Sequence, residues 1–592
     1  MLCAGLGCLA QSATDVPDSS LFTLHSSLPT LHSSLPTLHS SLPTLHSSLS
    51  THQSSIIHRD YGFIKRSDPW LSSINAAALT RFATASIAEA ELSLTRTKGG
   101  FVDYHDSPNA LQLEASVESF YRLSDRAVLF GSISYDNFAG KDMAGSAFTQ
   151  LSPLTTHAPF DIVEDSLGNE GDKHRDVYQL TGGFGVDIYH GLSIGTRLDY
   201  TAANYAKYKD LRHKNKLMDL QLSAGFYAPL GRWGAVGANY LYHRNTESLQ
   251  FSTYGKTDKV YQSLVGYAAF MGQREQFGVE GFTDKSREMP LVNDYNGLSL
   301  QFSLHPAILH SSLSTLHSSS STLHSSLSTL HSSFFNSFSY LHRRGYYGRK
   351  SPYTITYTDH HSDIYNYAAR LTLLPRRSRL CLDFSLSAEN LRNDANTYRE
   401  LKNDAGATYY NYYAKVKTAN KLWVDGNVAL TADLGIQGEQ PTWTLQAGLD
   451  WMHRKQTAYL YPYYRRQRLS AREYFASATH HLATRYGVWS FSLNGSFRQG
   501  SGQPCEDLTY TQPSEKMDAP ATMEVWLMRE YQWLTSAQYA VGGSVKYSFL
   551  FPETQMATYA KVSLQHRKSN ETNSHSQGCD HTQLSVALGC NF

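Results

Sequence analysis

The chain has 592 residues, of which 41% are hydrophobic, and its formal net charge is +1. This balance gives no electrostatic footprint for nucleic acid, so no nucleic-acid partner is expected. No run approaches the roughly 18 apolar residues of a membrane-spanning helix, and the absence of a C-x-x-C pair leaves zinc-ribbon and thioredoxin-like sites without support.

These averages fit a large soluble protein, but they also fit a transmembrane barrel, because only every second residue of a barrel strand faces lipid. Aromatic residues make up 12% of the chain, with 39 Tyr, 26 Phe and 8 Trp. Tyr and Trp are the residues that barrels place at the two membrane interfaces. The composition therefore favours a barrel.

The N-terminus resembles the end of a secretory signal peptide. Residues 2–10 are apolar or small, and a polar stretch follows Ala10. Residues 1–10 are therefore predicted to be a residual signal peptide whose true start lies upstream, because no Lys or Arg precedes Arg59. The alternatives are a lipoprotein signal through Cys8 and a buried apolar segment of a cytosolic protein.

Two low-complexity segments carry a heptapeptide repeat. The sequence LHSSLPT recurs from Leu24 to Ser50, and a degenerate copy runs from Leu309 to Ser333. The repeated prolines of the first copy would break a helix in each second turn. We therefore predict a low-complexity linker over residues 11–55 and a disordered insert over 305–333, either as filler or as weak metal ligands through the eight histidines.

The last strand is the clearest pattern in the chain. Leu584, Val586, Leu588 and Cys590 alternate with small or polar residues up to the terminal Phe592. Successive side chains of a strand point to opposite faces, so this segment has one apolar and one polar face. Phe592 is predicted to close the barrel. Eight more segments alternate in the same way: 111–118, 180–188, 192–199, 219–226, 380–387, 424–433, 443–451 and 489–497.

A soluble β-sandwich also alternates, but most of these segments suit a tilted span of roughly 9–11 residues better than sandwich strands of about five or six. Tight turns at 228–231, 375–378 and 551–554 alternate with long loops at 138–175, 499–532 and 570–580, as in outer-membrane barrels. The predicted fold is an all-β, transmembrane antiparallel barrel over residues 56–592, interrupted at 305–333. At about 25 residues per strand it has about 20 strands, within a range of 16–24.

Four passages carry a family resemblance: DPWLSSINAAAL (68–79), GGFVDYHDS (99–107), SFYRLSD (119–125) and residues 343–365. The chain resembles an uncharacterised bacteroidete-type family of outer-membrane barrels, a domain of unknown function. The resemblance implies an outer-membrane location in a Gram-negative bacterium, but no activity. The chain is more distantly similar to channels of the fatty-acid-transporter type, whose N-terminal hatch has an Asn-Pro-Ala motif; Asn75-Ala76-Ala77 lacks the proline.

Catalytic motifs are missing, since the chain has no G-x-S-x-G, H-E-x-x-H or P-loop. Three polar residues stand at alternate positions, so their side chains would lie on one face of a strand: Asp359, His361 and Asp363. Such a face would suit either a metal site or ordinary exposed polar positions. Ser477 with His480 or His481 would suit a surface hydrolase, but no acid or oxyanion donor can be placed. We expect no enzyme, no cofactor and no metal.

Two function classes remain. The first is a channel or transporter for an unidentified solute, and the second is a surface scaffold or adhesin that acts through long loops. Outer-membrane lipid and the barrel-assembly machinery are the expected partners of either. Charged residues at inward positions either line a conducting lumen or pair across it and only stabilise the wall; they are Glu114, Glu118, Arg197, Asp199, Asp219, Arg370, Asp425, Asp433, Asp450, Lys546 and Lys561.

Two cysteines fall in loops predicted at the outer end of the barrel. Cys505 and Cys579 flank the last three strands, so their loops lie one hairpin apart. A disulfide between them is one hypothesis, and two free thiols are the other. By parity, Cys381 is expected to face the lumen and Cys590 the lipid.

Overall fold

The computed structural model describes residues 60–82, 86–149, 159–164, 167–255, 258–277, 289–304, 331–348, 355–375, 377–437, 440–515, 517–551, 556–571 and 578–592. Residues 1–55 form a separate unit from residues 56–592. The predicted signal peptide, the linker and residues 305–330 of the second insert lie outside the described residues.

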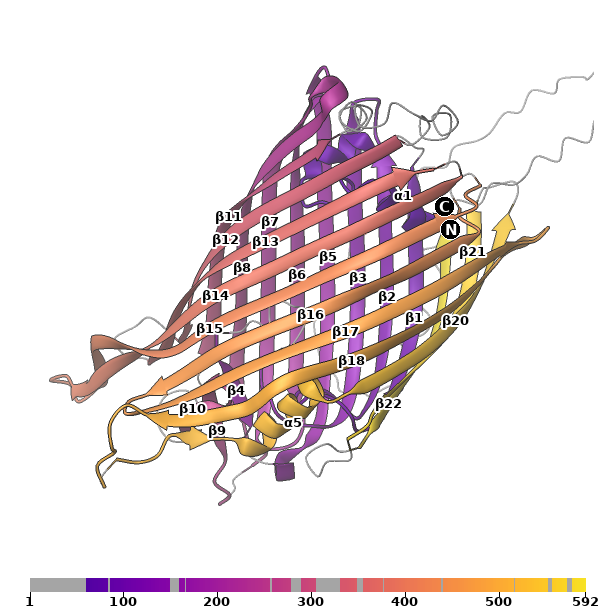
Figure 1. The fold of residues 1–592 in the computed structure, drawn as a ribbon. Helices are drawn as coiled ribbons and strands as arrows, with labels where there is room; N and C mark the ends of the chain where they lie inside the picture. The colour runs from indigo at the N-terminus through magenta and orange to yellow at the C-terminus, as the bar shows by residue number, and fades with distance from the viewer. Residues whose placement is uncertain are drawn as a thin grey trace, which may run out of the picture. The chain divides into compact units, whose positions relative to one another are not determined.

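Eighteen strands form one closed antiparallel sheet, in which each wall strand pairs with the next along the chain (Figure 1). The count lies within the predicted range and two below the central estimate. The wall strands are β1 (Ile87–Lys98), β2 (Asn109–Arg122), β3 (Ala127–Met143), β5 (Gly171–Tyr189), β6 (Leu192–Lys207), β7 (Arg212–Pro229), β8 (Gly234–Ser252), β11 (Met289–Leu304), β12 (His331–Gly348), β13 (Thr356–Leu374), β14 (Ser378–Lys402), β15 (Thr408–Leu434), β16 (Trp443–Leu460), β17 (Tyr463–Ala483), β18 (Gly487–Thr509), β20 (Gln538–Phe551), β21 (Met556–Ser569) and β22 (Asp580–Asn591).

The barrel closes between its first and last strands. β22 pairs with β1 in an antiparallel register that sets Leu588 opposite Leu92. The backbone of Phe592 exchanges two hydrogen bonds with Ala88, of 2.7 and 2.9 Å. Closure leaves no free sheet edge, which is what a sheet surrounded by lipid requires.

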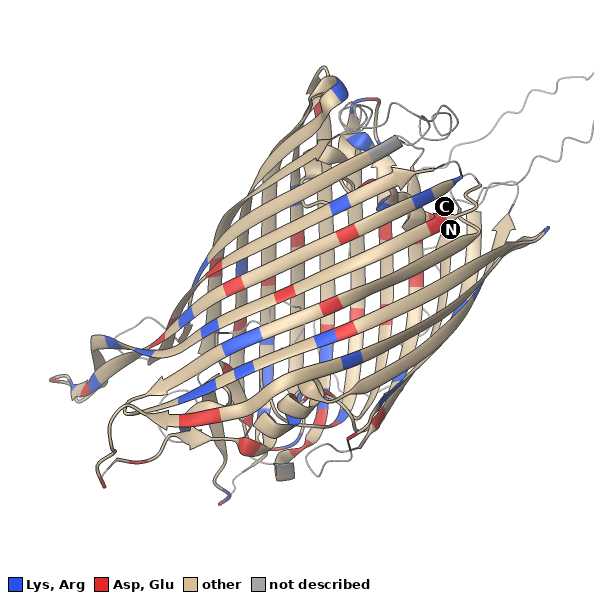
Figure 2. Ribbon diagram, in the orientation of Figure 1, with Lys and Arg blue, Asp and Glu red and all other residues tan. Residues whose placement is uncertain are grey.

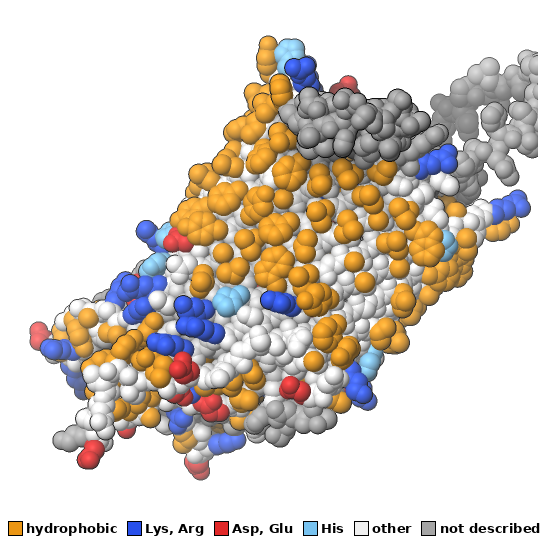
Figure 3. Space-filling model, viewed as in Figure 1, with side chains coloured by type: hydrophobic (Ala, Val, Ile, Leu, Met, Phe, Trp, Pro, Cys, Tyr) orange, Lys and Arg blue, Asp and Glu red, His pale blue; other side chains and the backbone are white. Residues whose placement is uncertain are grey.

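Alternation along the strands gives the wall an apolar outer face and a polar inner face. On β22, Leu584, Val586 and Leu588 are exposed on the outside, and the same parity recurs around the wall, so that hydrophobic side chains cover much of the outer surface (Figure 3). The structure thus has the two-faced strands of a transmembrane barrel.

The two ends of the barrel differ. The end with Ile87 and Phe592, here the turn end, has short connections such as 123–126, 190–191 and 484–486. The opposite end, the loop end, has the long connections. β11 ends and β12 begins at the turn end, and β12 takes in residues 331–333, the last three of the predicted insert.

The wall is taller on one side, because β14–β18 have 18 to 27 residues whereas β1, β2 and β20–β22 have 12 to 14 (Figure 1). The predicted loop at 499–532 is therefore wrong in its first third. β18 continues to Thr509, since β17 extends beside it as far as Tyr463. Residues 500–504, which include glycine and proline, belong to this paired stretch. The register shifts at a bulge, where β18 has one residue more than the segment of β17 between Arg466 and Arg468.

Most of the remaining elements lie inside the wall. At the turn end are the helix α1 (Tyr61–Ser67) and the 3₁₀ helix η1 (Ala76–Arg81). At the loop end, β4 (Asp161–Glu164), β9 (Gln262–Ala268), β10 (Met271–Gln276) and β19 (Ala521–Thr522) form a second sheet, next to α5 (Glu524–Thr535). Short 3₁₀ turns lie at η2 (Leu167–Asn169) and η3 (Gly231–Trp233). In the described part of the chain, no helix is both long and apolar enough to cross a membrane.

Candidate functional site

Residues 60–82, here called the plug, cross the lumen at the turn end. The side chain of Lys65 donates to Glu118 on β2 at 2.5 Å. On another side of the barrel, Arg370 of β13 donates to the backbone carbonyl of Arg66 at 3.0 Å, and Arg66 lies 3.9 Å from Asp433 on β15. The plug is therefore attached to opposite parts of the wall.

Aromatic contacts supply the apolar part of this attachment. Trp70, which is 2% exposed, packs edge-on against Tyr227 of β7 and Phe335 of β12, with ring centroids 5.0 and 5.1 Å away. Phe82 stacks on Phe120 of β2 at 5.0 Å. Aromatic side chains of this size carry much of the burial energy of an interior contact, so the plug has a core of its own with the wall.

Local capping explains why both plug helices form. The Asp60 carboxylate accepts a 2.6 Å bond from the Phe63 N–H at the start of α1. The side-chain amide oxygen of Asn75 accepts from the Ala77 N–H at 3.2 Å and caps η1. Each cap satisfies a backbone donor that a helix start leaves unpaired.

Inward-facing glycines allow η1 to lie directly on the wall. A Cβ atom at Gly195 of β6 would lie 2.3 Å from the Ala77 nitrogen, and one at Gly185 of β5 would lie 2.5 Å from the Ala76 oxygen. Real Cβ atoms do not approach so closely, so only glycine permits this contact.

The plug corrects the prediction that residues 56–592 are all barrel, since the wall begins at Ile87. A segment of this kind is not found by alternation, the pattern that predicts strands. Two signals were available: residues 60–82 do not alternate, and Asp60 and Asn75 are N-cap residues placed before short helical stretches.

At the loop end, β4, β9, β10, β19 and α5 form a second closure, here called the lid. Trp526 of α5 donates to the backbone carbonyl of Glu164 in β4 at 2.9 Å. Arg465 of β17 donates to Glu524 of α5 at 2.7 Å and to the carbonyl of Ala269 at 3.2 Å. The lid is thereby joined within itself and to the wall.

A buried ion cluster fixes β4 to the wall. Lys173 of β5 lies 2.9 Å from the Glu164 carboxylate, and Lys207 of β6 also contacts it. Both lysine side chains have no exposed surface. Loss of one partner would leave a buried charge unpaired, which is strongly destabilising.

The β1–β2 connection, residues 99–108, packs against the lid. The Tyr104 hydroxyl donates to Asp161 of β4 at 2.9 Å. Burial, with the nearby Glu530 carboxylate, raises the pKa of Asp103 to about 6 against the opposing effect of His105. Burial disfavours the charged form of His105, but the carboxylates of Asp106 and Asp103 outweigh burial and raise its pKa.

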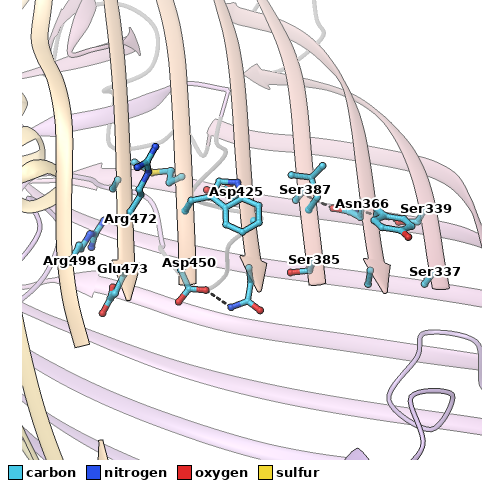
Figure 4. Close-up of a pocket in the computed structure, with 18 residues that line it drawn as sticks. Ser337, Ser339, Asn366, Ser385, Ser387, Asp425, Asp450, Arg472, Glu473 and Arg498 are labelled. Atoms are coloured by element: carbon cyan, nitrogen blue, oxygen red, sulfur yellow. Dashed lines mark hydrogen bonds between the residues drawn. The ribbon is translucent and has the colours of Figure 1, made fainter. Parts of the chain in front are cut away.

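A polar cavity of about 580 Å³ opens on the inner wall. Its inward-facing lining comes from β12 to β18 and is rich in hydroxyl, amide and carboxylate groups (Figure 4): Ser337, Ser339, Asn366, Ser385, Ser387, Asp425, Asn427, Asp450, Glu473 and Arg498.

Neighbouring strands share hydrogen bonds along this lining. Ser387 donates to Asn366 at 2.7 Å, and Asn366 donates to Ser339 at 3.3 Å. Asn427 donates to Asp450 at 2.5 Å (Figure 4). Such networks hold polar side chains in fixed positions.

All eleven charged residues predicted to line the lumen have inward parity, opposite to the exposed apolar positions of their strands. Several pair with neighbouring side chains of the wall or with the plug rather than across the lumen. Arg197 bonds Asp199 at 2.8 Å, and His243 lies 2.9 Å from Asp219. The other pairs are Glu118 with Lys65, Arg370 with Asp383, Asp433 with Arg379, and Asp450 with Asn427.

The remaining four are distributed around the lumen. Lys546 of β20 and Lys561 of β21 are cross-strand neighbours, and the Lys546 ammonium lies 3.7 Å from the ring centroid of Tyr559. Asp425 lines the cavity, whereas Glu114 lies on β2, opposite Asp136. Strand register therefore brings only part of the predicted set together.

The proposed metal face is on the outside of the barrel. Asp363 accepts bonds from His342 and Tyr340, both at 2.8 Å, and Lys415 donates to Asp359 at 2.5 Å. In the described ranges, no group of three or more His, Cys, Asp or Glu side chains is placed to hold a metal ion.

The residues weighed for a hydrolase do not converge. His480 and His481 are successive strand residues and face opposite sides of the wall. The His480 ring lies 4.3 Å from the Trp443 ring and is tilted against it, and His481 bonds Ser490 at 2.9 Å rather than Ser477.

The hypothesis of a Cys505–Cys579 disulfide is wrong in this structure, where both thiols are free. The Cys579 carbonyl accepts a 2.7 Å hydrogen bond from the Ser569 N–H, so these two residues lie at the same height in the barrel. Ser569 and Arg498 both pair with Gln538, and Cys505 lies seven residues beyond Arg498. At about 3.3 Å per residue along a strand, Cys505 therefore lies roughly 20 Å farther along the barrel axis than Cys579. A disulfide needs Cα atoms within about 7 Å. Cys381 is buried at an inward position, and Cys590 has outward parity.

Solved structures similar in fold include one transporter and two receptors. The outer membrane transporter YddB from Escherichia coli is 8% identical, with 85% of this chain and 80% of that chain covered and a TM-score of 0.37. The ferric preacinetobactin receptor BauA from Acinetobacter baumannii is 8% identical, with 86% and 80% covered and a TM-score of 0.35. The alcaligin receptor FauA from Bordetella pertussis is 6% identical, with 85% and 76% covered and a TM-score of 0.31.

Similarities of this size do not carry a ligand from those proteins to this chain. Among curated proteins, none is significantly similar to it in sequence. Residues 76–592, which include η1 of the plug and the whole wall, match the model of a family of unknown function, DUF6850. The chain belongs to this family.

Proposed function

We propose that this protein is a gated transporter for a small hydrophilic solute in the outer membrane of a Gram-negative bacterium. Two features support the membrane location: the sheet is closed, and its outer face is apolar (Figure 3). A barrel of 16–18 strands is wide enough to leave an aqueous channel, so the interior has room for a solute path. Such a barrel would depend on outer-membrane lipid and on the barrel-assembly machinery.

The polar cavity is the observation that carries the proposal. Hydroxyl and amide groups from four neighbouring strands offer both donors and acceptors to a hydrophilic solute. Three inward carboxylates, Asp425, Asp450 and Glu473, face one inward guanidinium, that of Arg498. This excess of negative charge favours a neutral or cationic solute over an anionic one.

The plug supports the gating part of the proposal. It bonds to β2 on one side and to β13 and β15 on the other, so a solute that leaves the lumen at the turn end must displace it. Short polar contacts and two apolar clusters shared with the wall hold it in place, and these are local contacts that can open without unfolding the wall.

A reversible cross-link tests this gate. The hydroxyls of Thr80 in η1 and Ser193 in β6 lie 2.9 Å apart, so Thr80→Cys with Ser193→Cys places two thiols within disulfide reach. In planar bilayers, the oxidised double variant is expected to stay closed and to regain the conductance of the unmodified protein on reduction. Each single variant is the control, since neither forms the cross-link.

If the unmodified protein never conducts and liposomes that contain it take up no hydrophilic solute, the transporter proposal fails. A scaffold or adhesin with a closed lumen would give that result. The described lid packs inward onto the wall rather than projecting from it, so the exposed ends of the tall strands β14–β18 would then be the surface that binds a partner.

A further inference from the structure

An unpaired basic cluster lies on the outer face of the tall wall. Lys455 of β16 and Arg468 of β17 are direct cross-strand partners, and Arg466 lies two residues from Arg468 on the same face. All three side chains are exposed. Cβ atoms of direct cross-strand partners lie about 4.5–5.5 Å apart, and like charges at that spacing destabilise a sheet.

No carboxylate among the described residues forms an ion pair with any of the three. The neighbours of the Lys455–Arg468 pair in the register are Leu422 and Gln503, both uncharged. The nearest carboxylate in the register is Glu506, opposite Arg466, but the Arg466 guanidinium lies instead over the Tyr464 ring, 5.0 Å from its centroid.

The neighbouring strands behave differently. On the same outer band, Arg244 pairs with Asp294 at 3.6 Å, Arg392 with Asp394 at 3.0 Å, and Lys415 with Asp359 at 2.5 Å. Three outer cations, on β8, β14 and β15, thus have a counter-charge, although the exposed Arg344 of β12 has none among the described residues; on β16 and β17 three neighbouring cations stand together without one. Figure 2 shows several Lys and Arg positions on these tall strands.

The cluster adjoins the apolar surface. Leu422, the β15 partner of Lys455, is 40% exposed, and Tyr474 of β17 is 50% exposed six residues from Arg468 toward the turn end. Figure 3 shows Lys and Arg side chains gathered along this side of the hydrophobic surface. Basic side chains that border the apolar band of a membrane protein meet lipid headgroups, whereas the apolar side chains of that band meet acyl chains.

We infer that Lys455, Arg466 and Arg468 bind the phosphate of an anionic lipid headgroup while the adjacent apolar surface holds its acyl chains. Arginine and lysine both bind phosphate oxygens through charge-assisted hydrogen bonds, and a phosphate between Lys455 and Arg468 would remove their mutual repulsion. The inference rests on the membrane location given under the proposed function.

The test uses the full chain in detergent and a diphosphorylated glucosamine lipid as the probe. The matched variants are Lys455→Gln with Arg468→Gln, and Arg399→Gln with Lys402→Gln near the tip of the β14–β15 hairpin, where both residues are also exposed. Each pair removes one Lys and one Arg. The lipid is expected to raise the unfolding temperature of the unmodified protein and of the hairpin variant, and to bind the cluster variant at least about 10-fold more weakly.

Without lipid, the cluster variant is expected to unfold no earlier than the unmodified protein, because it loses only a repulsive pair. Equal binding by both variants, or equal stabilisation by the dephosphorylated lipid, overturns the inference. Stabilisation by inorganic phosphate at the same concentration shows an anion site without a lipid requirement and also overturns it. A protein that conducts but ignores the lipid leaves the proposed transport function intact.

Discussion

The side chains of Asn75 and Gln301, 226 residues apart, are joined by a buried amide–amide hydrogen bond of 3.1 Å. Gln301 of β11 in turn donates to Asn239 of β8 at 2.9 Å. Asn75 also donates to the Phe226 carbonyl at 2.9 Å and caps η1. One plug residue therefore ties a helix start to three wall strands.

Asn75→Ala is expected to loosen the plug without unfolding the wall. It removes an N-cap worth about 1 kcal/mol and leaves buried partners unsatisfied at about 1–3 kcal/mol. Hydrogen exchange of the η1 amides should speed up by 10-fold or more, while β1–β22 amides stay protected. Combined with Gln301→Ala, the effects should be less than additive; strict additivity would show that the two amides act independently.

Gly195→Val is expected to displace the plug. The new Cβ would lie 2.3 Å from the Ala77 nitrogen, and overpacking of this kind costs about 1–3 kcal/mol, while valine itself suits a strand. Single-channel recordings should show a higher open probability. Gly182→Val on β5 is the matched control, since a Cβ there meets nothing within 4 Å. Equal conductance of the two variants would contradict the role given to η1.

Lys65→Glu is expected to raise conductance, because it replaces the 2.5 Å contact with Glu118 by repulsion between two carboxylates. Glu118→Lys in the same chain restores an opposite-charge pair and should return the recordings to those of the unmodified protein. A double variant that stays as open as Lys65→Glu would mean that Lys65 acts through something other than this ion pair.

Residues 99–108 are expected to dock more tightly at pH 5 than at pH 8. The pKa of Asp103 is raised from 3.8 to about 6, so the docked state binds more protons between these values and loses stability as the pH rises through them. The raised pKa of His105 has the same effect. The stability that it adds to the docked state is complete below pH 6.5 and is lost as the pH rises through the shifted pKa.

Hydrogen exchange of residues 99–108, corrected for the intrinsic effect of pH, measures this dependence. Asp103→Asn should flatten it between pH 4 and about 6, whereas Asp125→Asn in the turn 123–126 should leave it unchanged. Slower exchange at pH 8 than at pH 5 in the unmodified protein would reverse the sign and refute the assignment.

Thiol labelling tests the separation of Cys505 and Cys579. Both should react with an alkylating reagent in the native protein without prior reduction, and gel mobility should not change on reduction. The buried Cys381 should react only after unfolding. Protection of both Cys505 and Cys579 that disappears on reduction would restore the disulfide hypothesis.

Alternation alone determined which face each wall residue takes. Because successive strand residues point to opposite sides, the parity of Leu584 to Leu588 and of the eleven charged residues could be read without knowing any neighbour. The barrel class followed from this pattern together with composition and the alternation of short turns and long loops, and the approximate strand number followed from the length of the chain.

Only the tertiary structure decided which residues meet. Strand lengths and registers depend on neighbours that are distant in sequence, which is why β18 runs past Cys505 and why Lys65 finds Glu118. The plug was visible as two capped stretches without alternation, but the glycines that receive it belong to other strands. Period-two patterning is a local property of the chain, whereas register and closure arise only when all eighteen strands pair at once.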